Sequence, residues 1–582
     1  MNDKALTIYK ASAGSGKTFT LSAEYIKLLI LNPNSYRSTL AVTFTNKATE
    51  EMKMRILSQL YGIWKQLPDS KGYADKIKKE LGIGDKMLTE RAGIALHNIV
   101  SNYSYFRIET IDSFFQSVLR NLARELDLTA NLKVELNDED IESNAVDQLI
   151  TELREKDDFL KWIMDFIQEN IDEEHDWNVI GNIKEFGKNI FKEFYKTHSK
   201  ELNKKLAEKG FFGRYTHTLR QLRDNAKKDI QTGADRFFQA LEERGYTVND
   251  LSNKTKGVAR YFIKIRNGVM DDSILTKTAV GALNGETDKW VTGSAPQDLR
   301  DFATGTLAKI LEETEEVRAK KWRTYQSAAL TLRNINQLRL LNSIDTKVRE
   351  MNMETNRFLL SDTHSLLHSL IQDSDSPFIF EKIGTRLETI MIDEFQDTSV
   401  IQWQNFKVLL EECMSNGETK GNLIVGDVKQ SIYRWRSGDW RMLNNIETEF
   451  PGKNDMLKLE PLDTNWRSQR NVIVFNNAFF KAMADVEYDN LTQLDSSENG
   501  IQRAEQLKKA YSDVEQKVAE KKKEALGRVE ITLLPGNKGN NSNEEMMEMV
   551  KTNIESLLNQ GAALADIAII ARSNNTLQAI AD

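Results

Sequence analysis

The residues best suited to chemistry stand within the first twenty positions of the chain. A glycine-containing segment lies between a β-rich run over 5–9 and a helical pattern over 19–31, and it comprises Ala11, Ser12, Ala13, Gly14, Ser15, Gly16, Lys17 and Thr18. A strand, a glycine loop and a helix in this order form a phosphate-binding loop, whose backbone N–H groups and helix dipole attract an anion. Lys17 is expected to reach the β- and γ-phosphates, and the Thr18 hydroxyl to ligate Mg²⁺. The segment therefore predicts a site for a nucleoside triphosphate.

A second candidate is the pair Asp393 and Glu394, which follows the apolar run over 389–392. Asp393 is expected to hold Mg²⁺, directly or through water, and Glu394 to polarise the attacking water as the general base. An acidic pair after a strand also occurs by chance. The phosphate-binding loop in the same chain favours the functional interpretation.

A third candidate follows the β-rich run over 423–425. Gln430 comes three residues after a Gly-Asp pair, and it could sense the γ-phosphate or the attacking water. Tyr433 and Trp435 then alternate with two arginines, a pattern that suits the stacking of unpaired bases and contact with phosphates. The alternative for this cluster is a core tryptophan flanked by surface arginines.

Two further segments carry candidate residues. Phe44 ends a β-rich run over 40–44, and Thr45 precedes a helix that Asn46 could cap. Phe44 could stack on a base or simply end the strand core, and Thr45 could bind a phosphate of a nucleic-acid strand. Arg467 stands at the start of a later α/β unit, where it could act as an arginine finger on the γ-phosphate. The alternative for Arg467 is an ordinary surface arginine.

Composition narrows the class of protein. The chain has 582 residues, 40% hydrophobic and 29% charged, with a net charge of −8, so any nucleic-acid contact must come from local patches. One cysteine excludes an internal disulfide or a four-cysteine iron–sulfur cluster. Neither a signal region nor a long apolar window occurs. We therefore expect a cytoplasmic protein without a membrane partner.

The elements that must position these residues suggest an α/β fold with a parallel sheet. We expect the first half of a P-loop domain over 1–125, a large helical insertion over 126–350 and the second half over 351–460. An incomplete second α/β unit is expected over 461–582, with strands over 529–534 and 567–571. Because the chain stops just after a strand signal, we expect it to be part of a longer protein.

Taken in order, these segments resemble the motor of superfamily 1 helicases of the UvrD/Rep type, with most similarity to the RecB/AddA branch (exonuclease V beta subunit-like). The stretch over 425–436 is the part most specific to this family. The residue order of the phosphate-binding loop also resembles that of the RecB/AddA branch. The stretch Thr110-Ile111-Asp112-Ser113-Phe114 resembles a further DNA-contact motif, in which the family often has His where this chain has Asp112.

The resemblance implies RecA-like motor domains, ATP and Mg²⁺ as cofactors, and 3′-to-5′ movement on DNA. Lys17 and Thr18 would bind phosphates and Mg²⁺, Asp393 would be the Mg²⁺ ligand, and Glu394 the catalytic base. Gln430 would couple nucleotide state to DNA grip, and Arg467 would contact the γ-phosphate. Phe44, Thr45, Tyr433 and Trp435 are the expected DNA contacts. The implied partners are single-stranded DNA, duplex ends and a second helicase–nuclease subunit.

The insertion is implied to be a DNA-facing arm. Its segment over 318–349 is locally basic, which suits a track along a phosphate backbone, although a charged helix face is more often only solvated. Two further family motifs are not found before the last residue. We therefore expect ATP binding but weak duplex unwinding by this chain alone, in a protein of DNA repair or recombination. The alternatives are a different P-loop enzyme, such as a small-molecule kinase, and a non-catalytic DNA-binding scaffold subunit.

Overall fold

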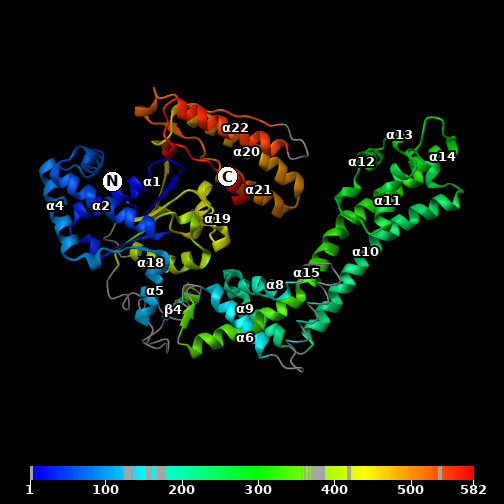
Figure 1. The fold of residues 1–582 in the computed structure, drawn as a ribbon, viewed down its shortest axis with the longest axis horizontal. Helices are drawn as coiled ribbons and strands as arrows, with labels where there is room; N and C mark the ends of the chain where they lie inside the picture. Colours follow the sequence, from blue (N-terminus) through cyan, green and yellow to red (C-terminus); the bar gives the residue numbers. More distant parts are fainter. Residues whose placement is uncertain are drawn as a thin grey trace. The chain divides into compact units, whose positions relative to one another are not determined.

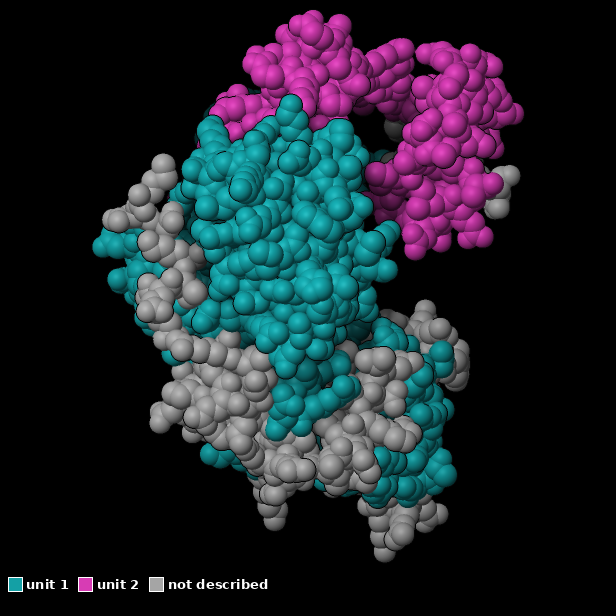
Figure 2. Space-filling view, turned by 90° about the vertical axis from the view of Figure 1, so that its left-hand side faces the viewer, with its two compact units in different colours: residues 1–8, 20–459 teal, residues 9–19, 460–582 magenta. Residues whose placement is uncertain are grey.

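The chain is described from a computed structural model. The described residues are 4–122, 133–135, 138–152, 160, 163–164, 167, 178–208, 210–355, 357–359, 362–364, 367–368, 387–415, 421–534 and 541–581. They fall into two compact units (Figure 2), of which unit 1 comprises residues 1–8 and 20–459, and unit 2 comprises residues 9–19 and 460–582. The phosphate-binding loop thus belongs to unit 2.

The largest sheet among the described residues has six strands, in the order β3-β2-β6-β7-β1-β8. The strands are β1 (Leu6–Ala11), β2 (Thr39–Thr43), β3 (Ile108–Thr110), β6 (Thr389–Ile392), β7 (Asn422–Gly426) and β8 (Leu457–Leu462). The pairs β2–β3, β2–β6 and β6–β7 are parallel. Every residue of β2, β6 and β7 is buried, as expected for parallel strands covered on both faces. The predicted α/β fold with a parallel sheet is confirmed.

Helices follow the strands of this sheet. They are α1 (Lys17–Leu31), α2 (Asn46–Lys65), α3 (Lys71–Leu81), α4 (Asp85–Ser101), α5 (Ile111–Leu122), α18 (Val400–Ser415) and α19 (Trp440–Asn444). Phe114 and Phe115 of α5 pack against Phe406 of α18, with ring centroids 5.6 and 4.5 Å apart respectively. This packing brings the beginnings of α5 and α18 close to each other, although 290 residues separate Asp112 from Gln402.

A long helical arm occupies the stretch between β4 (Lys133–Glu135) and β5 (Arg357–Leu359), two strands that pair in parallel. Figure 1 shows α10 and α15 side by side along the arm, with α11 to α14 gathered at its far end. The helices are α6 (Asp138–Thr151), α8 (Val179–Gly187), α9 (Glu193–Ala207), α10 (Phe211–Glu243), α11 (Ala259–Arg266), α12 (Lys277–Leu283), α13 (Thr287–Trp290), α14 (Gln297–Phe302) and α15 (Ala308–Glu354). The far end and the base each have a hydrophobic core of their own.

Most of the basic residues predicted as a phosphate track on α15 are committed to ion pairs. Arg318 is 3% exposed and pairs with Glu315 and Asp272. Four more are paired as follows: Lys320 with Glu316, Lys321 with Asp229, Lys347 with Glu152 and Arg349 with Asp345. For Arg318 and Lys347, whose side chains are 3% and 15% exposed, the ion pairs favour a structural role over contact with DNA.

The later part of unit 2 is built on α20 (Arg470–Leu494) and α21 (Glu498–Ala510), followed by α22 (Asn541–Asn559) and α23 (Asn574–Ala581). Two short strands, β9 (Thr464–Asn465) and β10 (Lys517–Val518), pair in parallel. They join the segment before α20 to the segment after α21. The strands predicted over 529–534 and 567–571 are wrong, since neither segment is paired in a ladder. Leu533 and Ile570 are 89% and 94% exposed, so apolar alternation without a neighbouring strand did not produce a sheet.

No helix among the described residues combines the length and apolar character that crossing a membrane requires.

Candidate nucleotide and nucleic-acid site

The phosphate-binding loop has the backbone that its glycines predict. Gly14 and Gly16 have φ values of +75° and +86°, in the left-handed region that favours glycine. The Ser12 N–H donates to Ser15 Oγ at 3.3 Å, and the Ser15 N–H donates to the Ser12 carbonyl oxygen at 3.1 Å. α1 begins at Lys17, so the loop leads directly into a helix N-terminus. This backbone suits the binding of phosphate oxygens.

Two amide side chains from the later part of unit 2 hold this loop. Asn465 Nδ2 and Gln516 Nε2 both donate to the carbonyl oxygen of Ala13, at 3.1 and 2.8 Å. Asn465 Nδ2 also donates to Gln516 Oε1 at 2.9 Å. The Trp466 N–H donates to the Gly14 carbonyl oxygen at 2.9 Å. The roles of Asn465 and Gln516 were not predicted, because an isolated amide side chain in a sequence carries no signal of its partner.

The same amide positions the predicted arginine finger. Asn465 Oδ1 accepts from the N–H groups of Arg467 and Ser468, at 2.9 and 2.8 Å. A Cβ added at Gly14 would lie 3.0 Å from the Cβ of Arg467 and 2.8 Å from Asn465 Oδ1. A side chain at position 14 is therefore excluded both by the left-handed φ and by this close packing. The structure brings Arg467 to the phosphate-binding loop.

The acidic pair lies at the end of β6 in unit 1. Asp393 is 8% exposed, and its Oδ1 accepts from the N–H of Glu394 at 3.0 Å. Glu394 has φ +49°, an uncommon conformation for a residue other than glycine and one that costs free energy. The chain therefore leaves the strand β6 through a left-handed residue, and this residue is the predicted catalytic base.

Gln396 joins the acidic segment, here residues 393–397, to the next strand, and this role was not predicted from the sequence. Its Nε2 donates to Glu394 Oε2 at 2.8 Å and to Asp397 Oδ2 at 3.2 Å, and its Oε1 accepts from the Asp427 N–H at 2.9 Å. Gln396 is 1% exposed. The buried amide thus fixes the Glu394 carboxylate relative to the Gly-Asp pair that ends β7.

Gln430 is held beside that pair. Gln430 Nε2 donates to Asp427 Oδ2 at 2.6 Å, and Lys429 Nζ pairs with Asp427 Oδ1 at 3.1 Å. Ser431 Oγ donates to the Gln396 carbonyl oxygen at 3.2 Å. Glu394 and Gln430 are therefore connected through Gln396 and Asp427, all within unit 1.

The predicted DNA-binding aromatics form a short row. The Phe44 and Tyr433 rings lie 4.5 Å apart, and the Tyr433 and Trp435 rings 6.0 Å apart. Trp435 is 70% exposed, which argues against a core tryptophan, and the Arg436 guanidinium lies 4.8 Å from the centroid of its ring. An exposed ring with a cation beside it suits stacking on an unpaired base.

Thr45, rather than Asn46, is the N-cap of α2. Thr45 Oγ1 accepts from the Ala48 N–H at 3.2 Å. The expectation that Asn46 caps this helix is wrong, because the extended backbone that a cap requires occurs at Thr45, with φ −127° and ψ 152°. The helix N-terminus follows directly on Phe44.

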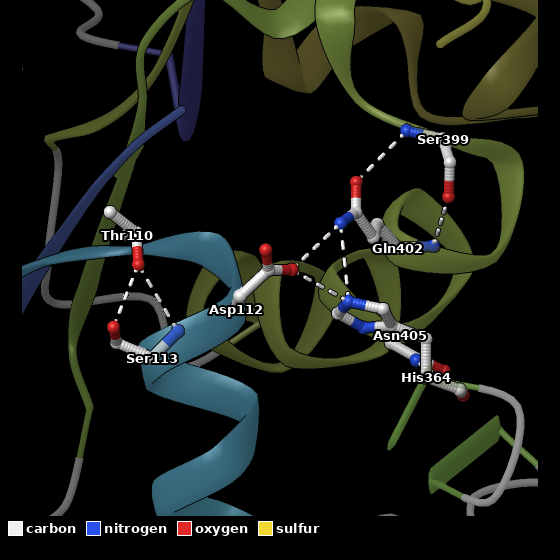
Figure 3. Close-up of polar contacts among 7 residues, drawn as sticks. All are labelled: Thr110, Asp112, Ser113, His364, Ser399, Gln402 and Asn405. Carbon is white, nitrogen blue, oxygen red and sulfur yellow. Dashed lines mark hydrogen bonds and ion pairs between the residues drawn. The ribbon is translucent and has the colours of Figure 1, made fainter. Parts of the chain in front are cut away.

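Asp112 is paired with a histidine from a distant segment (Figure 3). His364 Nε2 lies 2.9 Å from Asp112 Oδ1, and Gln402 Nε2 donates to the same oxygen at 3.3 Å. Burial acts to raise the pKa of Asp112, but the hydrogen bond and charge of His364 outweigh it and hold the pKa below its ordinary value. Asp112 is therefore an anion committed to an internal partner.

The predicted site residues fall in both units. Unit 2 brings together the phosphate-binding loop and Arg467. Unit 1 brings together Asp393, Glu394 and Gln430, and near them the row of Phe44, Tyr433 and Trp435. That Thr18 and Asp393 are Mg²⁺ ligands stays a prediction.

A parallel sheet, a glycine loop that leads into a helix and an acidic pair at a strand end define a P-loop nucleotide-dependent enzyme. The chain belongs to the UvrD/REP helicase family, whose N-terminal domain model matches residues 3–451. The predicted resemblance to UvrD/Rep helicases is thereby confirmed. Membership of this family also decides against a small-molecule kinase.

Curated relatives belong to the helicase–nuclease branch. The chain is 24% identical over 538 residues to an ATP-dependent helicase/nuclease subunit of Listeria monocytogenes serotype 4b (strain F2365). It is 24% identical over 518 residues to the exonuclease/helicase subunit RexA of Lactococcus lactis subsp. cremoris (strain MG1363). Each match covers 83% of this chain and 39% of the relative, so the chain spans about two fifths of their length. These names confirm the predicted similarity to the helicase–nuclease branch.

Proposed function

We propose that this chain is the ATP-hydrolysing, DNA-binding part of a DNA helicase that acts in repair or recombination. The observation that carries the proposal is the path through Gln396. This buried amide contacts the Glu394 carboxylate, and the Gln396 backbone carbonyl oxygen accepts from Ser431, two residues before Tyr433. A change in the state of the nucleotide at Glu394 would thus reach the aromatic row within a few residues.

The chain's own residues would divide the work as follows. The backbone N–H groups from Gly14 to Thr18 and the Lys17 ammonium would bind the phosphates of ATP. Glu394 would accept the proton of the attacking water. Arg467 would stabilise the charge that develops on the γ-phosphoryl group. The Thr18 hydroxyl and the Asp393 carboxylate would each be a ligand for Mg²⁺, and the ion would supply neutralisation of phosphate charge. The left-handed glycines and the 8% exposed carboxylate fit these roles.

Single-stranded DNA is the proposed partner of Phe44, Tyr433 and Trp435, with movement in the 3′-to-5′ direction. The relatives are named as subunits, which supports a second helicase–nuclease subunit as a further proposed partner. Duplex ends stay a prediction of the sequence. Hydrolysis of ATP is the activity we propose for the residues present, and weak duplex unwinding by this chain alone stays a prediction of the sequence. A cytoplasmic location stays a prediction of the sequence.

The proposal is tested by measuring ATP hydrolysis with and without single-stranded oligothymidylate, in the unchanged chain and in Lys17→Ala. We expect turnover that DNA stimulates and that Lys17→Ala abolishes. A non-catalytic scaffold would bind DNA equally well with either residue and hydrolyse nothing. If the unchanged chain bound neither nucleotide nor DNA, that result would contradict the proposal.

A further inference from the structure

Three segments of unit 1 meet at Asp112, His364 and Gln402 (Figure 3), a group of residues here called the junction. Asp112 belongs to the first turn of α5, which follows β3. Gln402 belongs to the first turn of α18, which follows the acidic segment. His364 follows the strand β5, which comes after the last helix of the arm. Besides the Asp112 contacts, His364 Nε2 lies 3.2 Å from Gln402 Nε2.

The junction is attached to the base of the arm. Asp362, two residues before His364, pairs with Lys196 of α9 at 2.5 Å, and the Lys196 side chain is only 7% exposed. Glu193, at the beginning of α9, accepts from the Ile401 N–H at 2.8 Å. The helix α9 therefore contacts both the histidine segment and the beginning of α18.

The junction is also attached to the acidic segment. Ser399 and Gln402 cap α18 reciprocally, because the Ser399 N–H donates to Gln402 Oε1 at 3.0 Å and the Gln402 N–H donates to Ser399 Oγ at 3.3 Å. The acidic segment ends directly before this cap, and the Asp397 N–H donates to the Glu394 carbonyl oxygen at 3.0 Å. A shift of Gln402 would therefore displace the cap that follows the catalytic carboxylates.

The loop of the aromatic row is tied to the same cap. Ser399 and Gly438 form an antiparallel bridge, and the Asp439 N–H donates to the Thr398 carbonyl oxygen at 3.1 Å. A Cβ added at Gly438 would lie 3.0 Å from the Asp397 carbonyl oxygen. The charge of Arg436, beside Trp435, contributes to the lowered pKa of Asp112. The junction thus lies between the arm, the acidic segment and the predicted DNA contacts.

The imidazole of His364 is enclosed rather than offered to a ligand. Its side chain is 15% exposed, and its Nδ1 is buried without a hydrogen-bond partner among the described residues. Its ring also packs edge-on against Phe115 at 5.2 Å, and its carbonyl oxygen accepts from Asn405 Nδ2 at 3.0 Å. These contacts hold the ring with Nε2 directed at Asp112.

We propose that Asp112, His364 and Gln402 are positioning residues that couple the helical arm to the acidic segment, so that DNA bound to the chain accelerates hydrolysis of ATP. The inference rests on the proposed function and deepens it. In this proposal none of the three touches ATP. Each acts through the cap of α18 and thereby through Glu394.

The test compares three variants with the unchanged chain. His364→Ala removes the donor to Asp112, and it should lower the ratio of DNA-stimulated to basal ATP turnover about 2- to 30-fold. His364→Gln places an amide nitrogen where the imidazole Nε2 stood, and it should restore most of the ratio. His198→Ala is the matched control, because His198 lies exposed on α9 and, within the described part of the chain, its ring contacts Phe194 of its own helix.

A second measurement does not depend on turnover. Hydrogen exchange over 397–405 should change when oligothymidylate is added to the unchanged chain, and this change should be lost in His364→Ala. If the unchanged chain hydrolyses no ATP, the proposed function fails, while hydrogen exchange still decides whether the three residues couple bound DNA to the acidic segment. The inference is overturned if His364→Ala lowers basal and stimulated turnover equally, or leaves the exchange response intact.

Discussion

The side-chain amide of Asn465 donates a hydrogen bond of 3.1 Å to the carbonyl oxygen of Ala13, a residue 452 positions earlier in the chain. The phosphate-binding loop is therefore held by a side chain outside its own motif. The same amide oxygen accepts from the Arg467 N–H, so one residue holds both the loop and the predicted arginine finger.

Asn465→Ala should weaken ATP binding. The substitution removes a donor to Ala13 and leaves two N–H groups, of Arg467 and Ser468, without their acceptor. Each unsatisfied group costs about 1–3 kcal/mol, so we expect the affinity for ATP to fall about tenfold, as measured by titration with a fluorescent ATP analogue. Asn471→Ala is the control, because Asn471 is exposed and its side-chain amide donates to the carbonyl oxygen of Gly527, away from the loop. Equal affinities in the two variants would refute a role for Asn465 in holding the loop.

Gln396→Ala should lower kcat without weakening ATP binding. The buried amide fixes the Glu394 carboxylate, and a misplacement of the base by about 1 Å lowers turnover about 100-fold. Steady-state hydrolysis gives kcat, and the same fluorescence titration gives the affinity. Gln404→Ala, at an exposed position of α18, is the control. A fall in affinity with unchanged kcat would show that Gln396 supports the nucleotide pocket rather than the base.

Trp435→Ala should weaken binding of single-stranded DNA while ATP binding stays unchanged. Stacking of one base on an aromatic ring contributes about 1–3 kcal/mol, which corresponds to about 5- to 150-fold in affinity. Fluorescence anisotropy of labelled oligothymidylate measures the effect at a fixed salt concentration. Trp64→Ala is the control, since Trp64 is a 44% exposed tryptophan on α2, outside the aromatic row. Equal losses in both variants would argue against a specific stacking site.

Glu142→Gln should stabilise the base of the arm at high pH only. Glu142 is fully buried, and neither carboxylate oxygen has a hydrogen-bond partner among the described residues. Burial raises its pKa from 4.5 to about 7, against the opposing charges of Lys184 and Lys188. Between pH 4.5 and 7 the Glu142 carboxyl is ionised in the unfolded chain but still protonated in the folded one, so the free energy of unfolding falls as pH rises. Above pH 7 the folded chain carries the full cost of the buried charge.

The gain from Glu142→Gln is expected to be about 1–3 kcal/mol at about pH 8 and close to zero at about pH 4.5. Thermal unfolding at the two pH values measures it. Glu139→Gln, on the same helix but with a 66% exposed side chain, should show no such pH dependence. A gain of the same size at both pH values would mean that the effect comes from packing and not from the charge of Glu142.

Much of the motor fold was predictable because its signals are local. The phosphate-binding loop, the strand that ends in Asp393 and the strand that ends before Asp427 are each contained in a short run of residues. Continuous apolar runs predict buried parallel strands, and the carboxyl ends of such strands meet at one edge of the sheet. The strands predicted over 529–534 and 567–571 are absent from the structure. An apolar alternation forms a strand only where a neighbouring strand completes the hydrogen-bonded ladder.

The sequence alone determined that this chain has a phosphate-binding loop, an acidic pair and a tyrosine–tryptophan cluster, and that they resemble a UvrD/Rep motor. These features depend on residue types at short spacings. The tertiary structure alone decided that Asn465 and Gln516 hold the loop, that Gln396 bridges two strands and that His364 pairs with Asp112 across 252 positions. Such contacts depend on how distant elements pack, and no local pattern of side chains records which buried donor will find which acceptor.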